Sequence, residues 1–170
     1  HIPQTSGVSI SFDVIEKLTK LYPNNIIGMK DSSGDLDNML KITKYFSDFS
    51  LFSGSDSLAL KVCKRGGAGA ITATSNISAK LLCYIVNNYK NEASIKNFQD
   101  LQLLQEKIRE TLFAHEPISA LKAIMSIKNN NSDWNIVNPP LHKIDHPNSH
   151  KTIIALRELL KKMDELIPST

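Results

Sequence analysis

The sequence predicts an α/β protein in which parallel strands are covered by helices, followed by an all-helical segment. Up to residue 90, short apolar runs alternate with longer amphipathic stretches, and after residue 90 only the helical spacing of apolar residues remains. The apolar runs are continuous rather than alternating, which is typical of strands buried on both faces. Such strands occur in an open doubly wound sheet or in part of a (β/α)8 barrel, and both remain open at this point.

Strands and helices follow each other at regular intervals in the first 90 residues. Three runs have the pattern of buried strands: residues 25–30, 49–53 and 68–72. Four helices are predicted to begin after residues whose side-chain oxygens can accept hydrogen bonds from free backbone amides, namely Ser11, Asp35, Asp56 and Ser78. Three strands alone would leave an exposed sheet.

The remainder of the chain predicts helices joined by loops. Apolar residues at helical spacing cover residues 94–112, 117–127 and 151–167, whereas residues 129–133 and 138–147 are rich in Asn, Ser and Pro and predict loops. We therefore expect two domains, an α/β part over residues 1–90 and a helical part over residues 91–170.

Composition excludes several classes of protein. The 170 residues carry a net charge of +3 that is spread along the chain, without the clustered Arg and Lys of a nucleic-acid surface. Neither a membrane-spanning run nor a signal peptide is present, so we expect a cytoplasmic protein. Cys63 and Cys83 lie in apolar stretches, where reduced, buried thiols are common. The chain begins with His1 rather than Met, which indicates a piece of a longer protein.

Lys30 is the most informative residue for chemistry. It ends an apolar strand and precedes the polar turn Asp31–Asp35, and in parallel α/β folds ligands bind at the carboxyl ends of strands. Burial disfavours the ammonium form of a lysine, and a neutral amine can attack a ketone to form an imine. The alternative is a structural lysine that extends to solvent or pairs with Asp31.

The ends of the other two strands carry small or polar residues. Residues 54–57 (GSDS) follow the second strand and residues 72–76 (TATSN) follow the third. Small residues let a substrate approach the backbone, and hydroxyl and amide groups can orient it. Ordinary turn and helix-cap chemistry is the competing interpretation.

Other catalytic motifs are incomplete. Residues 65–70 (RGGAGA) lack the Gly-Lys-Ser/Thr of a phosphate-binding P-loop and do not complete GxGxxG, and residues 53–56 (SGSD) are not a GxSxG nucleophile elbow. His142, His146 and His150 recur every four residues, but Pro147 would break a helix that aligned them. We expect no metal and no cofactor.

Residues 26–35 (IIGMKDSSGD) resemble the Schiff-base lysine segment of the dihydrodipicolinate synthase / N-acetylneuraminate lyase family of class I aldolases. Three further segments resemble that family in the same order: residues 2–7 (IPQTSG) its loop after strand five, residues 53–56 its loop after strand seven, and residues 67–77 strand eight and its exit. Residues 138–141 (NPPL) and the helices around them resemble its C-terminal helical appendage.

The resemblance implies the C-terminal half of a (β/α)8 TIM barrel, with strands 6 to 8, followed by a small all-helical domain. It implies Lys30 as the residue that forms the imine with pyruvate or another 2-oxo acid, an aldehyde as the second substrate, and a homo-oligomer, in this family a tetramer. The residues that we expect to bind substrate are Thr5, Ser6, Ser32, Gly54, Ser55, Asp56, Ile71 and Ala73. Strands one to four, a carboxylate-binding loop and a proton-relaying tyrosine would precede His1.

Two departures from the family pattern bear on the substrate. Members that make dihydrodipicolinate usually carry an arginine where this sequence has Thr5, and neuraminate lyases carry an acidic residue where it has Ser57. A 2-keto-3-deoxy sugar acid or a related 2-oxo acid fits these residues as well as the substrates of the synthases or of the neuraminate lyases do. The interpretation from another functional class is a domain that binds or senses a 2-oxo acid without catalysis. Lys30 distinguishes the two, because simple binding needs no amine at the strand end.

Overall fold

A three-stranded parallel sheet in the order β1–β2–β3 lies at the centre of the first part of the computed structural model, which describes residues 1–167. The strands are β1 (Gly28–Asp31), β2 (Ser50–Ser53) and β3 (Gly69–Ala70). Lys30 is in register with Phe52, and Phe52 with Gly69. The predicted parallel strands are confirmed, but each is shorter than the apolar run that predicted it.

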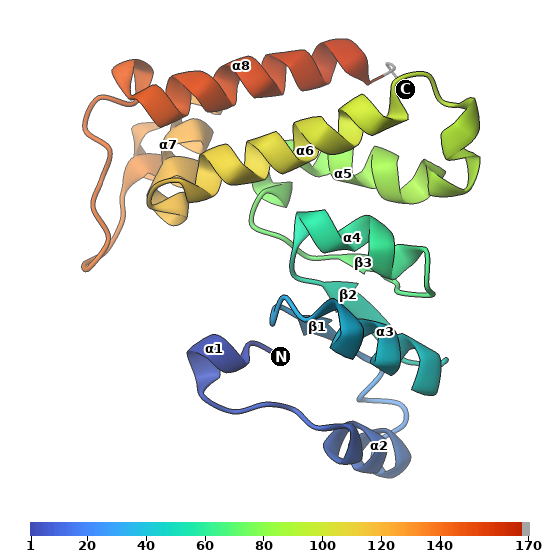
Figure 1. Cartoon of the computed structure of the whole chain (residues 1–170). Helices are drawn as coiled ribbons and strands as arrows, with labels where there is room; N and C mark the ends of the chain where they lie inside the picture. Colours follow the sequence, from blue (N-terminus) through green and yellow to red (C-terminus); the bar gives the residue numbers. More distant parts are fainter. Residues whose placement is uncertain (168–170) are drawn as a thin grey trace. The chain divides into compact units, whose positions relative to one another are not determined.

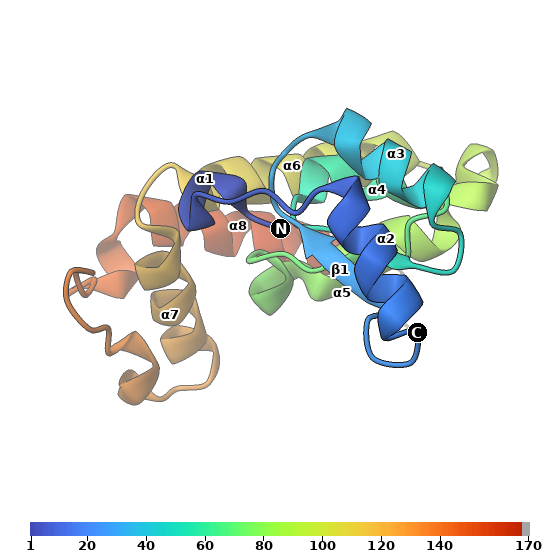
Figure 2. The ribbon, with the colours of Figure 1, turned by 90° about the horizontal axis from the view of Figure 1, so that it is seen from below.

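Helices cover one face of this sheet within the first compact unit, His1–Thr72. They are α2 (Phe12–Leu21), α3 (Leu36–Tyr45) and α4 (Asp56–Cys63), and the short helix α1 (Pro3–Ser6), which has no buried residue, precedes them. Leu51 of β2 is fully buried in a core to which the last three helices contribute, together with Ile15, Met39, Ile42, Phe49 and Val62. Helices α3 and α4 lie side by side in both views (Figure 1 and Figure 2). Burying side chains of this size stabilises a fold by about 1.5–3 kcal/mol each.

Two of the predicted helix starts are confirmed in this unit. Ser11 Oγ accepts a hydrogen bond from the Val14 amide at 3.3 Å, and Asp35 Oδ1 accepts one from the Asn38 amide at 2.9 Å. The prediction for Asp56 is wrong, since α4 begins at Asp56 itself. Its buried carboxylate accepts a hydrogen bond from Thr72 Oγ1 at 2.8 Å, which a residue in the capping position was not expected to do.

The second compact unit begins at Ala73 and is helical. Its α-helices are α5 (Ser75–Asn88), α6 (Phe98–Phe113), α7 (Pro117–Lys128) and α8 (Lys151–Leu166), and its short 3₁₀ helices are η1 (Tyr89–Ser94), η2 (Ser132–Asn135) and η3 (Pro147–Ser149). Helices α6 and α8 pack together, with Leu104, Ile108, Leu112, Ile153 and Leu156 buried (Figure 1). The three long helices predicted after residue 90 are therefore confirmed.

Helix α5 departs from the predicted start. It begins at Ser75, and Ser78 lies within it at a kink with φ −129° and ψ 26°. The Ser78 hydroxyl donates to the Thr74 carbonyl at 3.1 Å and accepts from Gln105 Nε2 at 3.2 Å, so it does not cap the helix. Within residues 1–167, no helix has the length and apolar character needed to cross a membrane. The boundary predicted at residue 90 remains a prediction.

Candidate functional site

At the carboxyl end of β1, the neighbouring side chains of Lys30 and Asp31 lie on opposite faces of the sheet. Because successive strand residues point to opposite faces, Met29 and Asp31 lie on the helix-covered face and Lys30 on the other. Met29 packs against the hydrophobic core, and Asp31 is fully buried. Lys30 is exposed, and its amine has no ion pair or hydrogen bond with any of residues 1–167. The amine is therefore free to meet a ligand on the open face of the sheet.

Asp31 does not pair with Lys30, so one form of the structural alternative for that lysine is wrong, whereas the other form, a lysine that extends to solvent, agrees with the exposure of Lys30. Asp31 Oδ1 accepts a hydrogen bond from the Ser33 amide at 2.8 Å, and Oδ2 accepts one from Asn38 Nδ2 at 3.0 Å. We expected Lys30 to be buried, but among residues 1–167 nothing covers its side chain and it is exposed. Desolvation of this amine requires protein beyond these residues.

Ser32 lies next to Lys30 with its backbone fixed and its hydroxyl available. Its amide donates to the His1 carbonyl at 2.8 Å, and its carbonyl accepts from Gln4 Nε2 at 2.7 Å. The half-buried Ser32 hydroxyl makes no hydrogen bond within the described part of the chain. Of the predicted substrate-binding residues, Ser32 is thus the one held directly after the lysine with a free polar group.

The segment before α2 is joined to this strand end by its backbone. The His1 nitrogen donates to the Lys30 carbonyl at 2.8 Å, so the His1 backbone bonds on both sides of Asp31, as a neighbouring parallel strand would. Thr5 is exposed. The Ser6 hydroxyl instead bonds within its own turn, to the carbonyls of Ile2 at 3.1 Å and Val8 at 3.0 Å.

Gln4 is a contact of the site that the sequence did not reveal. Its side-chain amide bridges the segment before α2 and the Ser32 carbonyl, residues 28 positions apart. No local pattern predicts such a bond, because an exposed glutamine in a short helix is common. Only the parallel pairing of the two segments brings the donor and acceptor together.

The carboxyl end of β2 packs against that of β1. The Gly54 amide donates to the Asp31 carbonyl at 2.7 Å. Ser55 Oγ lies 2.9 Å from Ser57 Oγ near the surface. Asp56 is buried and bonded to Thr72, so its carboxylate ties the start of α4 to the second residue after β3. Of Gly54, Ser55 and Asp56, Gly54 is therefore the residue in direct contact with the end of β1 and the loop that follows it.

The carboxyl end of β3 contributes differently. The Ile71 amide donates to the Ser53 carbonyl at 2.9 Å, which extends the ladder beyond β3, and the Ile71 side chain is 49% exposed. Ala73 is half-buried and begins the second unit, where its carbonyl accepts hydrogen bonds from the backbone and side chain of Asn76. The structure thus brings Lys30, Ser32 and Gly54 together within the first unit, whereas Ala73 belongs to the second.

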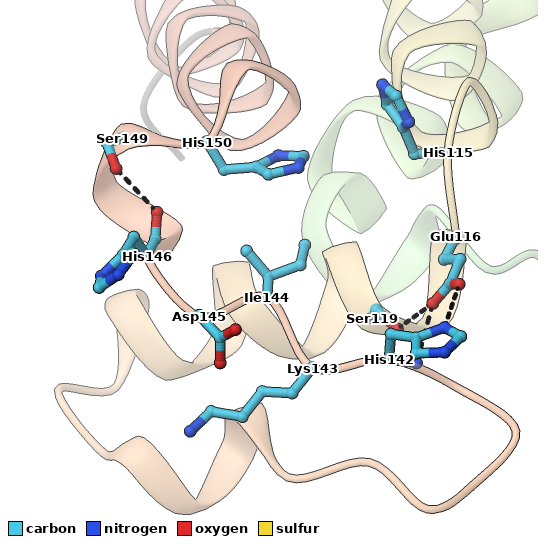
Figure 3. Close-up of a pocket in the computed structure, with 10 residues that line it drawn as sticks. All are labelled: His115, Glu116, Ser119, His142, Lys143, Ile144, Asp145, His146, Ser149 and His150. Atoms are coloured by element: carbon cyan, nitrogen blue, oxygen red, sulfur yellow. Dashed lines mark hydrogen bonds and ion pairs between the residues drawn. The ribbon is translucent and has the colours of Figure 1, made fainter.

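A second candidate site is a cavity of about 510 Å³ in the helical unit (Figure 3). Glu116, at the start of α7, accepts hydrogen bonds from the His142 amide at 3.1 Å and from Ser119 Oγ at 3.0 Å, and lies 2.9 Å from His142 Nδ1. The His142 imidazole, followed by these two donors, lowers the pKa of Glu116 because each contact favours the carboxylate.

The same cavity is bordered by His115 and His150, whose ring centroids lie 5.8 Å apart in an edge-to-face arrangement (Figure 3). Within residues 1–167, no three His, Cys, Asp or Glu side chains are grouped as metal ligands would be. The Glu116 carboxylate is already engaged by His142 and Ser119. The exposed amine at the end of β1 is therefore the stronger candidate for chemistry.

Comparison with known proteins shows relatives over most of the chain. The sequence model of the dihydrodipicolinate synthetase family matches residues 1–159. A 4-hydroxy-tetrahydrodipicolinate synthase of Methanococcoides burtonii is 30% identical over 161 residues, which cover 94% of this chain and 54% of that relative.

Solved structures are similar over nearly the whole chain. The N-acetylneuraminate lyase of Fusobacterium nucleatum complexed with pyruvate is 28% identical with a TM-score of 0.75, and the match covers 95% of this chain and 52% of that one. The 4-hydroxy-tetrahydrodipicolinate synthase of Methylacidiphilum fumariolicum SolV has a TM-score of 0.79 at 22% identity, covering 99% and 56%. The chain thus spans about half the length of these proteins.

Proposed function

The chain belongs to the dihydrodipicolinate synthetase family, and from this premise we propose that the whole protein is a class I aldolase or lyase acting on a 2-oxo acid such as pyruvate and an aldehyde. Lys30 forms the Schiff base in this proposal. The observation that carries it is the Lys30 amine, which stands at the carboxyl end of a parallel strand without an ion pair in residues 1–167. The family match over residues 1–159 supports the same chemistry.

The reaction uses the amine as a nucleophile and then as an electron sink. The neutral Lys30 amine attacks the keto carbon, water leaves, and the protonated imine acidifies the neighbouring carbon. Loss of a proton gives an enamine, which attacks the aldehyde carbonyl to form the new C–C bond. Cleavage of a 2-keto-3-deoxy sugar acid is the same sequence in reverse. The free hydroxyl of Ser32 is positioned to hydrogen-bond to the substrate beside the imine.

The substrate that we favour is a 2-keto-3-deoxy sugar acid or a related 2-oxo acid, which is cleaved to pyruvate and an aldehyde or formed from them. Thr5 offers a small, exposed hydroxyl where a synthase of dihydrodipicolinate would offer a guanidinium for the substrate carboxylate. The second candidates are dihydrodipicolinate synthesis and neuraminate cleavage, since relatives with both names match this chain. Ser57, exposed on α4, stands where neuraminate lyases carry an acidic residue.

Borohydride trapping tests this proposal directly. The complete protein is treated with pyruvate and sodium borohydride, and the reduced adduct is located by mass spectrometry of its peptides. We expect the adduct on Lys30. Lys30→Arg should abolish it, because arginine stays protonated and cannot form an imine, whereas Lys41→Arg, on the exposed surface of α3, should retain it. An adduct on another lysine, or none in the intact protein, would contradict the assignment.

Several further features belong to this proposal. Residues 1–170 alone are expected to be inactive, since they span about half the length of the relatives. A homotetramer and a cytoplasmic location are what the family resemblance favours. If trapping fails while pyruvate still binds, the protein is instead a 2-oxo-acid-binding or regulatory domain that retains the fold.

A further inference from the structure

A buried carboxylate lies directly beside the proposed nucleophile, on the other face of the strand. Asp31 is fully buried and has no ion pair with any of residues 1–167. Burying a charge is costly unless strong hydrogen bonds compensate it. Asp31 has two of them, from the Ser33 amide at 2.8 Å and from Asn38 Nδ2 at 3.0 Å. A carboxylate retained at such a cost calls for a role that an apolar residue could not fill.

These two hydrogen bonds join the strand end to the helix that follows it. Asn38 lies in the first turn of α3, and Ser33 lies in the loop before it. Ser33 Oγ in turn accepts from the Asp35 amide at 3.1 Å, and Asp35 caps α3 through the Asn38 amide at 2.9 Å. Side-chain hydrogen bonds therefore connect the whole loop, from Asp31 at the end of β1 to the first turn of α3.

The loop that this network fixes carries Ser32 and directly follows the strand that carries Lys30, the two residues assigned to the substrate. Ser32 lies between Asp31 and Ser33, so the bond from the Ser33 amide to Asp31 sets the turn in which Ser32 stands. The Asp31 carbonyl also accepts from the Gly54 amide at 2.7 Å, which anchors the same residue to the next strand. Asp31 is held on both its side chain and its backbone, whereas the Lys30 amine and the Ser32 hydroxyl are free within residues 1–167.

We infer that Asp31 is a positioning residue of the active site, which acts through Asn38 and the Ser33 amide to hold Lys30 and Ser32 in the arrangement that imine formation needs. The inference rests on the proposed function. A carboxylate suits this role because it only accepts hydrogen bonds, and both of its partners only donate at these atoms. An asparagine at position 31 would direct an NH₂ group toward one of the two donors, and Asn38 could keep a bond there only by turning over its amide, so the present arrangement would change.

The direction of the hydrogen bond from Asn38 to Asp31 provides a test, because exchanging the two residues reverses donor and acceptor. In Asp31→Asn, the Nδ2 group of Asn38 would face another amide donor, and only a turned-over Asn38 could bond to it. In the double variant Asp31→Asn with Asn38→Asp, the side-chain amide at position 31 can donate to the new carboxylate while its oxygen still accepts from the Ser33 amide. The double variant therefore restores both bonds with the charge moved to α3. Asp37→Asn is the matched control, since Asp37 is exposed in the same helical turn.

The experiment measures the rate of borohydride-trappable imine formation with pyruvate in the complete protein, together with KM and kcat. We expect Asp31→Asn to lower the trapping rate roughly ten- to a hundredfold, as small misplacements of a reacting group do. Asn38→Ala, which removes one bond and leaves Asp31 in place, should lower it less and serves if Asp31→Asn does not fold. The double variant should recover to within about threefold of wild type, and Asp37→Asn should be unchanged.

Two outcomes overturn the inference while sparing the proposed function. One is a wild type that traps pyruvate and an Asp31→Asn or Asn38→Ala protein that traps it equally fast. The other is a double variant with wild-type thermal stability but no recovery of the trapping rate, which would show that Asp31 acts through something other than this pair. A wild type that traps nothing overturns the proposed function and this inference with it.

Discussion

Gly54 and Ser32 are packed so closely that only a glycine fits at position 54. A Cβ atom added to Gly54 would lie 2.8 Å from Ser32 Cα and 2.8 Å from the Asp31 carbonyl oxygen, and it would also contact Ser32 Oγ. Backbone atoms cannot yield as the end of a flexible side chain can. The loops that follow β1 and β2 are therefore in contact through the backbone, and the glycine is required by the packing of the candidate site.

Gly54→Ala should consequently destabilise the protein and disturb Ser32. We expect a loss of about 1–3 kcal/mol in the free energy of unfolding, the usual cost of an added methyl group in a packed region. Urea denaturation of the complete protein measures it. Ser57→Ala, which removes an exposed hydroxyl nearby, should stay within about 0.5 kcal/mol of wild type. Equal stabilities for Gly54→Ala and wild type would show that the two loops are not in this contact.

Thr5 gives a prediction about substrate choice. We expect the complete protein to use sugar-derived aldehydes with a higher kcat/KM than aspartate semialdehyde, because Thr5 provides no cation for the semialdehyde carboxylate. Thr5→Arg should raise kcat/KM for aspartate semialdehyde roughly tenfold, since a charge-assisted hydrogen bond contributes about 1.5–3 kcal/mol.

Ser9→Arg is the control for this substitution, because it adds the same charge to an exposed position in the same segment. It should leave both values of kcat/KM unchanged. A wild-type enzyme that strongly prefers aspartate semialdehyde would mean that another residue replaces the arginine and that our argument from Thr5 is mistaken.

Local patterns predicted the parts of the fold that depend on local physics. Ser11 and Asp35 cap helices because a short side-chain oxygen before an apolar-periodic run has few other partners. The strand ending on Lys30 and the long helices α6 to α8 follow from the period of apolar residues. Asp56 has the same local signature as Asp35, yet its partner is Thr72, which is 16 residues away in sequence. A long-range partner is invisible to a local pattern.

The candidate site shows the same division. Position at a strand end indicated Lys30, because the carboxyl ends of parallel strands gather ligands, and the family resemblance added Ser32; both roles stay predictions. The pattern could not show that Asp31 bonds to Asn38, that Gln4 reaches the Ser32 carbonyl, or that Ser6 turns into its own loop. Each depends on which way a side chain points once the segments have packed. Cys83 was likewise expected to be buried and is exposed.

The two cysteines should differ in reactivity. Burial raises the pKa of the Cys63 thiol, so less of it is thiolate near neutral pH, and Cys83 is exposed. We expect iodoacetamide at pH 8 to alkylate Cys83 roughly tenfold faster than Cys63 or more, as followed by mass spectrometry of the two peptides. In denaturing urea the two rates should converge. Faster alkylation of Cys63 in the folded protein would contradict its placement in the core.

The contact between Glu116 and His142 predicts a pH dependence of stability. The folded-state pKa of Glu116 is lowered, chiefly by the His142 imidazole, so the folded protein binds fewer protons here than the unfolded chain does. The stabilisation is therefore complete above the unfolded pKa of about 4.3 and is lost as the pH falls through the lower folded value. Glu116→Gln removes the charge that this stabilisation needs.

We expect Glu116→Gln to be less stable than wild type at pH 6 and the difference to shrink toward zero as the pH falls below about 4. Urea denaturation of the complete protein at several pH values between 6 and 3 measures both proteins. Glu158→Gln, at an exposed position of α8, is the control and should match wild type throughout. A difference between Glu116→Gln and wild type that is the same at every pH would show that Glu116 acts through packing rather than through its charge, because only the charged form is lost on acidification.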